Sequence, residues 1–394
     1  MNKKIGILTF FYNNRNYGGL LQAYALQRSI QNKIENCDCE QISYNLSPTP
    51  LKSKIYNAIN YSTPIDIFEM VFWDMSLKKI GEIFSYKYIQ RVIKNRLEAF
   101  KKFEDEIPHS KEVYNYESIK NSVKEYDVYV VGSDQIWNAG IDLETFLLSF
   151  APDSISKISY AASSGGIVFK GNQKKLLMDN LTFFDAISVR EKSLEKQINE
   201  LGNFSIKTVS DPVFLLEREE WKEIAQDIQI GEPYILCYLL GTNYRQRKMV
   251  ETVCVEIGYK LLVFPYITNN SFRLCDYNFG DIRDCDSGPK QFLGLIKNAE
   301  AVITDSFHAV AFSVIFNKCF CVLPRYQNGK KSKSNNRILD FLDQMHIRGR
   351  VAESKEQIIE VLNNTIEYKQ VNGYVDKWKT ESEAWMMDAL LKEK

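Results

Sequence analysis

A histidine lies where an apolar strand is expected to pass into an apolar helix, within the stretch from Ala301 to Phe316. The run from Ala301 to Ile303 is typical of a buried strand, and the apolar spacing after His308 predicts a buried helix. A helix that begins at the carboxyl end of a strand directs its N–H groups toward a bound anion. An imidazole can exchange protons there, since its unperturbed pKa is about 6.5. The sequence therefore predicts an acid–base residue beside an anion site, with a structural histidine as the alternative.

Polar loops also follow three short apolar runs in the first half of the chain. These loops cover residues 132–138, 163–166 and 190–193. In an open α/β sheet the carboxyl ends of parallel strands lie at one edge, where ligands bind. The loops are therefore expected to converge on one crevice, which scattered polar turns would not do.

The beginning of the chain has the pattern of a strand, a loop and a helix. Ile5–Phe10 is apolar, and the polar loop 12–19 ends in Gly18 and Gly19, after which apolar residues recur at helical spacing. Gln41–Tyr44 is the expected return strand. The loop lacks the G-x-G-x-x-G pattern of a dinucleotide site. Its glycines would instead let a ligand approach the backbone, or would form a plain tight turn.

Length and composition favour a folded protein of two domains. The chain has 394 residues, of which 45% are hydrophobic and 25% charged. Because 50 basic residues balance 50 acidic ones, we expect no nucleic-acid partner. The first apolar run is too short for a signal peptide, and no run is long enough to predict a membrane span. Eight cysteines without a secretion signal fit reduced thiols and a cytoplasmic location.

Two C-x-C pairs, Cys37/Cys39 and Cys319/Cys321, raise the question of a metal site. In a strand, side chains at i and i+2 point to the same face. The run from Cys319 to Leu323 has the composition of an ordinary buried strand, in which cysteine acts as a small apolar residue. We therefore expect no metal site and no cofactor.

Residues 51–106 interrupt the α/β pattern with apolar and aromatic residues at helical spacing among many lysines and arginines. We expect a helical insertion that covers one face of the first sheet or lies beside the cleft. The alternative is that this basic and aromatic surface contacts the inner face of the cell membrane or a lipid-linked substrate.

A linker is expected around residues 209–220, where Pro212 and a run of charged residues break the pattern. A second α/β unit follows and includes the His308 stretch. The basic loop Arg325–Ser334 is expected to close over a ligand, with a plain solvated loop as the alternative.

The whole pattern predicts an α/β fold in which two Rossmann-like domains face a central cleft. The expected units are an N-terminal domain (residues 1–208), a C-terminal domain that contains His308 (residues 209–370) and a C-terminal helix that packs back on the first domain (residues 371–394).

Separate segments spread over most of residues 4–345 carry recognisable motifs: Asn16–Gln27, Val131–Asn138, Ser188–Glu191, Ser210–Val213, Gly288–Pro289 with Phe292–Leu293, and Thr304–His308. In this order and combination they resemble the polysaccharide pyruvyl transferase family. That family is similar in architecture to the GT-B glycosyltransferases, so the resemblance implies a GT-B-like arrangement of the two domains.

Characterised pyruvyl transferases move the carboxyvinyl unit of phosphoenolpyruvate onto two hydroxyls of a sugar. The resemblance therefore implies a cyclic pyruvate ketal as product, with release of phosphate. It implies that His308 protonates the vinyl carbon or deprotonates a hydroxyl. Arginine suits the donor's carboxylate and phosphate because its planar fork binds oxyanions bidentately, although Arg190 has an ion pair with Glu191 as its alternative role. The implied donor-binding residues are Arg190, Arg325, Ser306, Ser164 and Gly165.

The implied acceptor is a hexose of a capsule or exopolysaccharide precursor, linked to a lipid or to a nucleotide. The residues expected to bind it lie in strand-end loops of the first domain, where an aromatic ring could stack on a sugar face or belong to the core. These residues are Asn16, Tyr17, Asp134, Gln135 and Trp137.

One residue departs from the family pattern. Many members have glycine after the histidine, whereas Ala309 follows it here and leaves open a related anionic donor. Two other functions also stay open. One is a nucleotide-sugar-dependent GT-B glycosyltransferase, and the other is a non-catalytic glycan-binding protein that has kept the fold.

Overall fold

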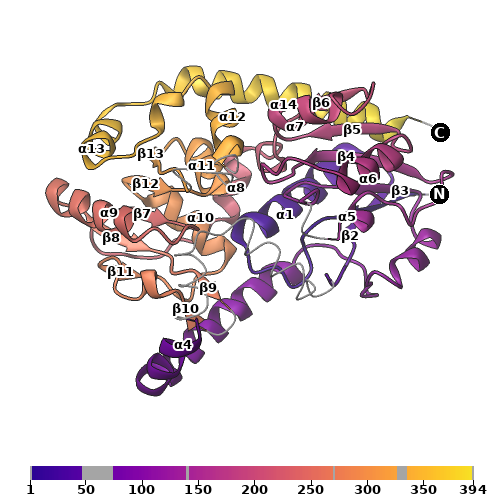
Figure 1. Cartoon of the computed structure of the whole chain (residues 1–394). Coiled ribbons are helices and arrows are strands. Elements are labelled where there is room, and N and C mark those ends of the chain that lie inside the picture. The colour runs from indigo at the N-terminus through magenta and orange to yellow at the C-terminus, as the bar shows by residue number, and fades with distance from the viewer. Residues whose placement is uncertain (1, 47–73, 139–141, 269–270, 326–334, 393–394) are drawn as a thin grey trace.

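The computed structural model describes residues 2–46, 74–138, 142–268, 271–325 and 335–392. Over these residues the chain forms two parallel sheets with helices packed on their faces (Figure 1). The predicted α/β fold with two Rossmann-like domains is confirmed. Residues 326–334 of the loop that was expected to close over a ligand lie outside the described residues. Residues 51–73 of the expected insertion also lie outside them.

The described residues contribute six parallel strands to the first sheet, in the order β2-β1-β3-β4-β5-β6. The order reverses between β1 and β3, and ligands of such sheets bind at the carboxyl ends of the strands beside a reversal. The strands are β1 (Lys3–Leu8), β2 (Cys37–Gln41), β3 (Val128–Val131), β4 (Ser156–Ala162), β5 (Ala186–Val189) and β6 (Ile206–Thr208), and the helices between them include α1 (Tyr17–Lys33), α5 (Leu143–Phe146), α6 (Asn172–Leu181) and α7 (Lys192–Asn199).

The return strand β2 begins at Cys37, earlier than the predicted Gln41–Tyr44. It is an edge strand, in which Cys37 and Cys39 are buried while Asp38 is exposed. Charged residues on the outer side of an edge strand are common because they prevent pairing with another chain. They also break the apolar run that a sequence pattern depends on, which explains the shifted boundary.

Five parallel strands from the described chain form the second sheet, in the order β11-β8-β7-β12-β13. Here the order reverses between β7 and β12, and His308 follows β12. The strands are β7 (Tyr234–Tyr238), β8 (Lys260–Val263), β11 (Ile282–Arg283), β12 (Ala301–Thr304) and β13 (Cys319–Val322), and the helices are α8 (Arg218–Ile224), α9 (Tyr244–Ile257), α10 (Pro289–Asn298), α11 (Phe307–Ile315), α12 (Asn336–Gln344) and α13 (Lys355–Asn363). A small antiparallel pair, β9 (Ile267–Thr268) with β10 (Ser271–Phe272), lies outside this sheet.

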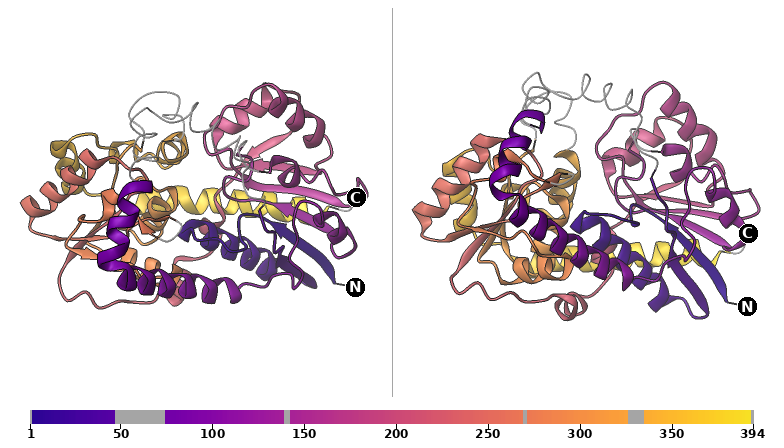
Figure 2. Two further views of the ribbon diagram at one scale, coloured as in Figure 1. Left: turned by 60° about the horizontal axis from the view of Figure 1, so that its bottom comes forward. Right: turned by 90° about the horizontal axis from the view of Figure 1, so that it is seen from below.

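The last helix, α14 (Tyr368–Leu391), runs along both domains (Figures 1 and 2). At its start, the Tyr368 hydroxyl donates to the carbonyl of Lys318, beside β13. At its end, the carbonyl of Leu390 accepts a hydrogen bond of 2.6 Å from Lys3 Nζ in β1. Helix α14 therefore ties the edge of the second sheet to the first sheet.

Helix α4 (Asp74–Asp105) is the described part of the helical insertion. It precedes β3 in the sequence, yet it packs against α10 and β10 of the second domain. Arg96 of α4 donates to the backbone carbonyls of Pro265 and Asp284, at 2.8 and 2.6 Å. The described part of the insertion thus packs against the second domain and, through Phe103 beside Tyr24, against α1 of the first domain.

The two domains share one continuous apolar core, which is centred on an aromatic group around Tyr17. Tyr17 belongs to α1, and its ring stacks on Phe292 of α10 at 4.5 Å between centroids. Its hydroxyl donates to the carbonyl of Ser287 at 2.7 Å. Phe100 and Phe264 pack against the same ring at 4.8 and 5.5 Å. A ring so enclosed holds α1 against the second domain.

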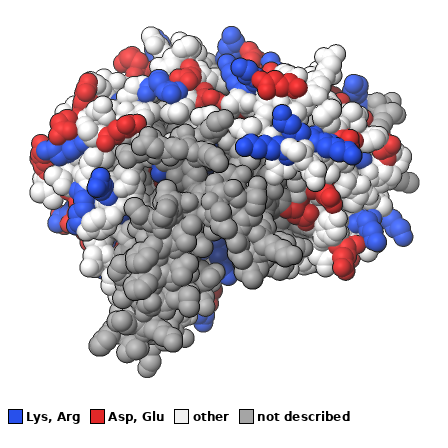
Figure 3. Space-filling model, in the orientation of Figure 1, with Lys and Arg blue, Asp and Glu red and all other residues white. Residues whose placement is uncertain are grey.

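The described surface has a mixed charge. Positive and negative side chains alternate over the part of the face that Figure 3 shows in colour, in keeping with the balance of 50 basic and 50 acidic residues. None of the described helices combines the length and the apolar composition that a membrane crossing requires.

We predict that Tyr17→Ala lowers the free energy of unfolding by about 3–5 kcal/mol, because it leaves a cavity between the domains. Tyr17→Phe keeps the ring and loses the hydrogen bond to Ser287, so its cost should be about 0.5–1.5 kcal/mol. Urea denaturation measures both. Tyr374→Ala, at an exposed tyrosine of α14, is the control and should stay within about 0.5 kcal/mol of wild type. Equal effects at Tyr17 and Tyr374 would contradict the role of Tyr17 in the interface.

Candidate active site

His308 lies in the first turn of α11, where the second sheet meets the first domain. The turn before it is held by Thr304, whose hydroxyl donates to the carbonyl of Tyr238 at 2.6 Å and accepts from the Ser306 N–H at 3.0 Å. Ser306 is the N-cap residue of α11, yet its side chain makes no capping hydrogen bond. The first N–H groups of α11 therefore keep their capacity to bind an anion.

Asp305 holds the loop that follows β7, on the other side of this turn. Its buried carboxylate accepts hydrogen bonds from the N–H groups of Leu240 and Gly241, at 2.6 and 2.7 Å. It also accepts one from Arg325 Nε at 3.2 Å. Arg325, predicted to hold the donor, is thus anchored to Asp305, which follows the carboxyl end of β12.

Arg190 lies at the carboxyl end of β5, in the opposite domain, and is almost completely buried. Its Nη1 donates to Asp211 at 2.7 Å and its Nε to Glu191 at 3.1 Å, so the ion pair with Glu191 is real and is accompanied by a second one. Its guanidinium also lies 4.5 Å from the ring centre of Phe307, the neighbour of His308. Burial opposes the charge, but Glu191 and Asp211 raise the pKa of Arg190, which keeps it positive.

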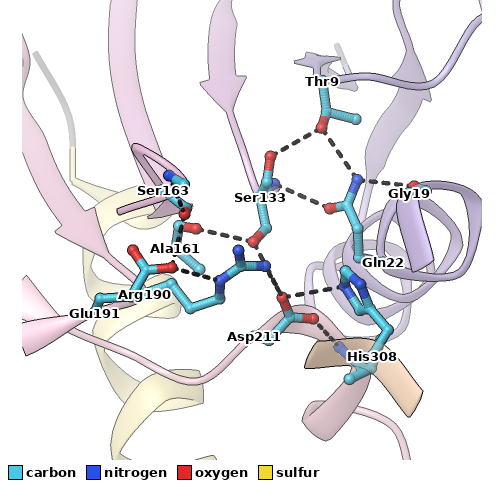
Figure 4. A network of polar contacts seen from close by, with 12 residues as sticks. Thr9, Gly19, Gln22, Ser133, Ala161, Ser163, Arg190, Glu191, Asp211 and His308 are labelled. Atoms are coloured by element: carbon cyan, nitrogen blue, oxygen red, sulfur yellow. Dashed lines mark hydrogen bonds and ion pairs between the residues drawn. The ribbon is translucent and has the colours of Figure 1, made fainter. Parts of the chain in front are cut away.

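Asp211 connects Arg190 to His308 (Figure 4). The same carboxylate oxygen that accepts from Arg190 lies 3.6 Å from His308 Nε2, slightly beyond hydrogen-bond length. Burial alone would raise the pKa of Asp211, but His308 and Arg190 outweigh it and hold the pKa well below its ordinary value. The carboxylate therefore stays ionised and places a negative charge beside the imidazole.

The segment that carries Asp211 was predicted to be a linker, and residues 209–216 do connect β6 of the first sheet to the second domain. They are buried throughout, and a short 3-10 helix (Pro212–Phe214) begins where the Asp211 side chain accepts from the N–H of Val213. Trp221 of the following helix is also fully buried. A connection buried between two domains can carry a functional side chain, which an exposed linker would not.

Gly18 lets the His308 ring approach α1. A Cβ atom at this position would lie 1.9 Å from His308 Nδ1, so any side chain would displace the imidazole. The two motifs that contain Gly18 and His308 are therefore in direct contact across the domain boundary. The predicted ligand approach at this glycine is instead an approach of the catalytic candidate itself.

A chain of hydrogen bonds supports Asp211 from the first domain (Figure 4). The hydroxyl of Ser133 donates to the carbonyl of Ala161 at 2.8 Å and approaches Asp211 at 3.4 Å. The N–H of Ser133 donates to Gln22 Oε1 at 3.0 Å, and Gln22 in turn donates to the hydroxyl of Thr9 at 3.1 Å. The ends of β1, β3 and β4 thus hold one side of the site.

The loop after β4 reaches Arg190 through Glu191. The Ser163 hydroxyl donates to Glu191 at 2.7 Å and accepts from the N–H of Gly165 at 3.0 Å. Ser164 and Gly165, predicted to bind the donor, therefore lie in a buried loop beside the ion pair of Arg190. Gly165 has a φ of 70° and faces Gln135, whose Oε1 would be 2.3 Å from a Cβ there.

Two of the predicted acceptor residues cannot contact a ligand. Trp137 is 0% exposed, and its Nε1 donates to the carbonyl of Phe146 at 3.0 Å inside the core. Tyr17 is 3% exposed and is enclosed in the interdomain aromatic group described above. Both predictions are wrong for the same reason: aromatic residues in these loops supply packing area, and a sequence motif does not tell the direction of a ring.

The other predicted acceptor residues lie in different surroundings. Asn16 is exposed and caps α1, where its side chain accepts from the N–H of Gly19 at 3.3 Å. Asp134 is largely buried with a φ of 62°, and its negative charge acts on Arg190. Gln135 is half-buried beside Gly165. These three residues remain candidates for the acceptor side.

The structure brings two residues to the site, Asp211 and Arg337, to which sequence reasoning assigned no role. Asp211 lies inside the motif Ser210–Val213, so its position was a signal. Among the buried polar atoms that have no partner in the described chain, four belong to this region: Arg190 Nη2, Glu191 Oε2, His308 Nε2 and Arg337 Nε. Buried polar groups are normally paired, so this concentration is typical of a functional site.

The sequence pattern of the family described as "Polysaccharide pyruvyl transferase" matches residues 16–326. None of the curated proteins matches the chain.

Two solved structures share the fold. The UDP-GlcNAc 2-epimerase from Methanocaldococcus jannaschii is 13% identical with a TM-score of 0.51, covering 98% of this chain and 99% of the epimerase. The UDP-N-acetylglucosamine 2-epimerase from Rickettsia bellii is 9% identical with a TM-score of 0.50, covering 98% of each chain. At these identities the likeness concerns the fold alone, which is the expected GT-B-like one.

We predict that Asp211→Asn lowers the free energy of unfolding by about 3–5 kcal/mol at pH 7, because it leaves Arg190 with an incomplete set of buried partners. Asp343→Asn removes an exposed carboxylate that also pairs with an arginine, and should cost less than about 1 kcal/mol. The folded-state pKa of Asp211 is depressed below the value of about 3.9 for an unperturbed aspartate. The carboxylate therefore stabilises the folded protein fully above about pH 3.9, and this contribution shrinks as the pH falls further. Denaturation curves at several pH values test both statements. A similar loss in the two variants would refute the central role of Asp211.

We predict opposite effects from two glycine-to-alanine changes in helices. Gly18→Ala should destabilise the protein by about 1–3 kcal/mol, since the new methyl group overlaps the His308 ring. Gly373→Ala, in α14, meets no atom within 4 Å and should stabilise it by about 0.5–1 kcal/mol. Urea denaturation distinguishes them. A neutral Gly18→Ala variant would show that His308 does not lie against α1.

Proposed function

Because this chain belongs to the polysaccharide pyruvyl transferase family, we propose that it transfers the pyruvyl (carboxyvinyl) group of phosphoenolpyruvate to a sugar. The acceptor is a sugar of a surface-polysaccharide precursor, and two of its hydroxyls form a cyclic ketal with the pyruvyl carbon. Phosphate is released. The observation that carries this proposal is the imidazole of His308 beside an ionised Asp211, with Arg190 on the other side of the same carboxylate.

The chemistry assigns one proton transfer at each stage to His308. As an imidazolium it donates its proton to the vinyl carbon of the donor, and the oxygen of the first sugar hydroxyl bonds to the neighbouring carbon. The neutral ring then accepts the proton of that hydroxyl. The bond from the carbon to the phosphate oxygen breaks with its electron pair on the phosphate. The second hydroxyl closes the ketal, and its proton leaves with the phosphate.

Asp211 acts through His308 as a positioning residue. Its pKa lies well below the ordinary value, so the carboxylate is negative at any pH at which the reaction would run. A fixed negative charge near Nε2 stabilises the imidazolium and orients the ring. Gly18 on the other side of the ring limits its movement.

The donor is an anion, and the site offers fixed positive groups for it. Arg190 has one nitrogen, Nη2, without a partner in the described chain, and the start of α11 has N–H groups that the Ser306 side chain does not cap. These groups suit the carboxylate and phosphate of phosphoenolpyruvate. The reaction needs no cofactor or metal, because acid–base catalysis and fixed cations are sufficient for it.

The acceptor would approach from the first domain, where Asn16, Asp134 and Gln135 are available. We propose a lipid-linked or nucleotide-linked glycan, and a reaction in the cytoplasm, to which the eight free cysteines are suited. A lipid-linked acceptor would bring the enzyme to the inner face of the membrane. A nucleotide-sugar glycosyltransferase is the alternative, since the two fold relatives named above are UDP-GlcNAc 2-epimerases.

We predict that His308→Ala lowers kcat by about 10²–10⁴-fold, which is the usual effect of removing a general acid or base. Release of inorganic phosphate from phosphoenolpyruvate in the presence of lipid-linked glycan fragments, followed by ³¹P NMR, measures it. His346→Asn is the matched control: His346 is exposed and has a φ of 56°, a conformation that asparagine tolerates.

Two results would contradict this function. Normal turnover in His308→Ala would exclude the catalytic role of the imidazole. Thermal stabilisation by UDP, with none by phosphoenolpyruvate, would favour the glycosyltransferase, since a ligand stabilises the state that binds it.

A further inference from the structure

Arg337 is a buried cation that has no partner among the residues that the structure describes. It lies in the first turn of α12 and is 7% exposed. Its guanidinium makes no hydrogen bond or ion pair with any residue in the described parts of the chain, and its Nε is completely enclosed. A buried charge is normally paired, because the loss of hydration is otherwise uncompensated.

Three features make this position unfavourable for an arginine in the absence of a ligand. Burial, followed by the like charges of Arg190 and Arg325, lowers the pKa of Arg337 to about 10. The start of α12 adds the positive end of a helix dipole, which disfavours a cation in the first turn. The side chain of the N-cap residue, Asn335, makes no capping hydrogen bond. An anion bound at this point would compensate the positive charges and the helix dipole, and would accept hydrogen bonds from the uncapped N–H groups.

Packing directs the same face of α12 toward the candidate active site. Asp340, one turn after Arg337, accepts a hydrogen bond of 3.2 Å from the N–H of Ser193 in α7, close to Arg190 and Glu191. Residues three apart share a helix face. On its other side, Phe341 packs against Phe307, next to His308, at 5.8 Å between ring centroids. Helix α12 thus bridges the residues of both domains that form the site.

We propose that Arg337 binds the phosphate group of the donor, an assignment that rests on the function proposed above. The charges of the other two arginines are already used: Arg190 is paired with Asp211 and Glu191, and Arg325 with Asp305. Arg337 has no such pairing within the described chain, so it is the cation best suited to a dianion. When the bond between the pyruvyl carbon and the phosphate oxygen breaks, the electron pair moves to that oxygen. Arg337 donates hydrogen bonds to the group on which this charge develops.

The test compares ligands that carry the phosphate with one that does not. Arg337→Met keeps much of the side-chain volume but removes the charge. Arg337→Lys keeps the charge but lacks the planar guanidinium that binds oxyanions bidentately. Arg348→Met is the control, because Arg348 is exposed and pairs with Asp343. The ligands are inorganic phosphate, phosphoenolpyruvate, UDP and pyruvate, and the measurements are dissociation constants and the melting temperature without ligand.

We expect Arg337→Met to weaken the binding of inorganic phosphate and phosphoenolpyruvate by about 10–100-fold, the range of one charge-assisted hydrogen-bond set. The affinity for pyruvate should change less than about 3-fold, because pyruvate has no phosphate group for Arg337 to bind. Without ligand the variant should be at least as stable as wild type, since it removes an unpaired buried charge. Arg337→Lys should recover part of the phosphate affinity, and Arg348→Met should match wild type.

Other outcomes would overturn the assignment. A large loss of stability without ligand, together with unchanged phosphate affinity, would make Arg337 a structural residue. Equal losses for pyruvate and phosphate would mean that Arg337 acts through its charge on the whole site and does not contact the phosphate. Failure of the wild type to bind inorganic phosphate would also refute it.

The same measurements separate this proposal from the proposed function. If Arg337→Met loses phosphate affinity and UDP protects the wild type better than phosphoenolpyruvate, the phosphate site is correct and the pyruvyl transfer is wrong. If Arg337→Met turns over phosphoenolpyruvate normally, the transferase is correct and the phosphate assignment is wrong.

Discussion

The candidate site depends on one buried carboxylate that lies between side chains of the two domains. Asp211 is fully buried, and its oxygen lies 2.7 Å from Arg190 in the first domain and 3.6 Å from His308 in the second. A carboxylate in such surroundings is costly unless positive charge compensates it. Arg190 provides that charge. The same carboxylate therefore stabilises the interface and lies beside the imidazole of the candidate acid–base residue.

This interaction requires the two domains to keep a fixed position relative to each other. The aromatic group around Tyr17, helix α4 and helix α14 each cross the boundary, and the apolar core continues through it. With the interface held by packing, the polar residues between the domains need not be optimal for stability. The unpaired atoms of Arg190, His308 and Arg337 lie there. Local conflicts of this kind, in an otherwise consistent fold, are typical of functional sites.

Much of the fold could be predicted from the sequence because strands and helices have local apolar periods. The alternation of short apolar runs and amphipathic helices indicated two parallel α/β units, and the turn before His308 indicated a helix start at a strand end. The predicted start of β2 was wrong because this edge strand carries charges that break its apolar run. Pro212 and charged neighbours indicated a connection at residues 209–216, but the burial of this segment depends on how the domains pack.

The sequence by itself determined the candidates for the chemistry: a histidine at a helix start, and arginines and carboxylates in motifs at strand ends. Only the tertiary structure decided how they are used. It put Trp137 and Tyr17 in the core, Asp211 between two cations, Gly18 against the His308 ring, and Arg337 beside the arginines of both domains. The reason is that residue type and spacing are local properties. The burial and the partners of a side chain depend instead on segments far apart in the chain, which meet only when both sheets pack together.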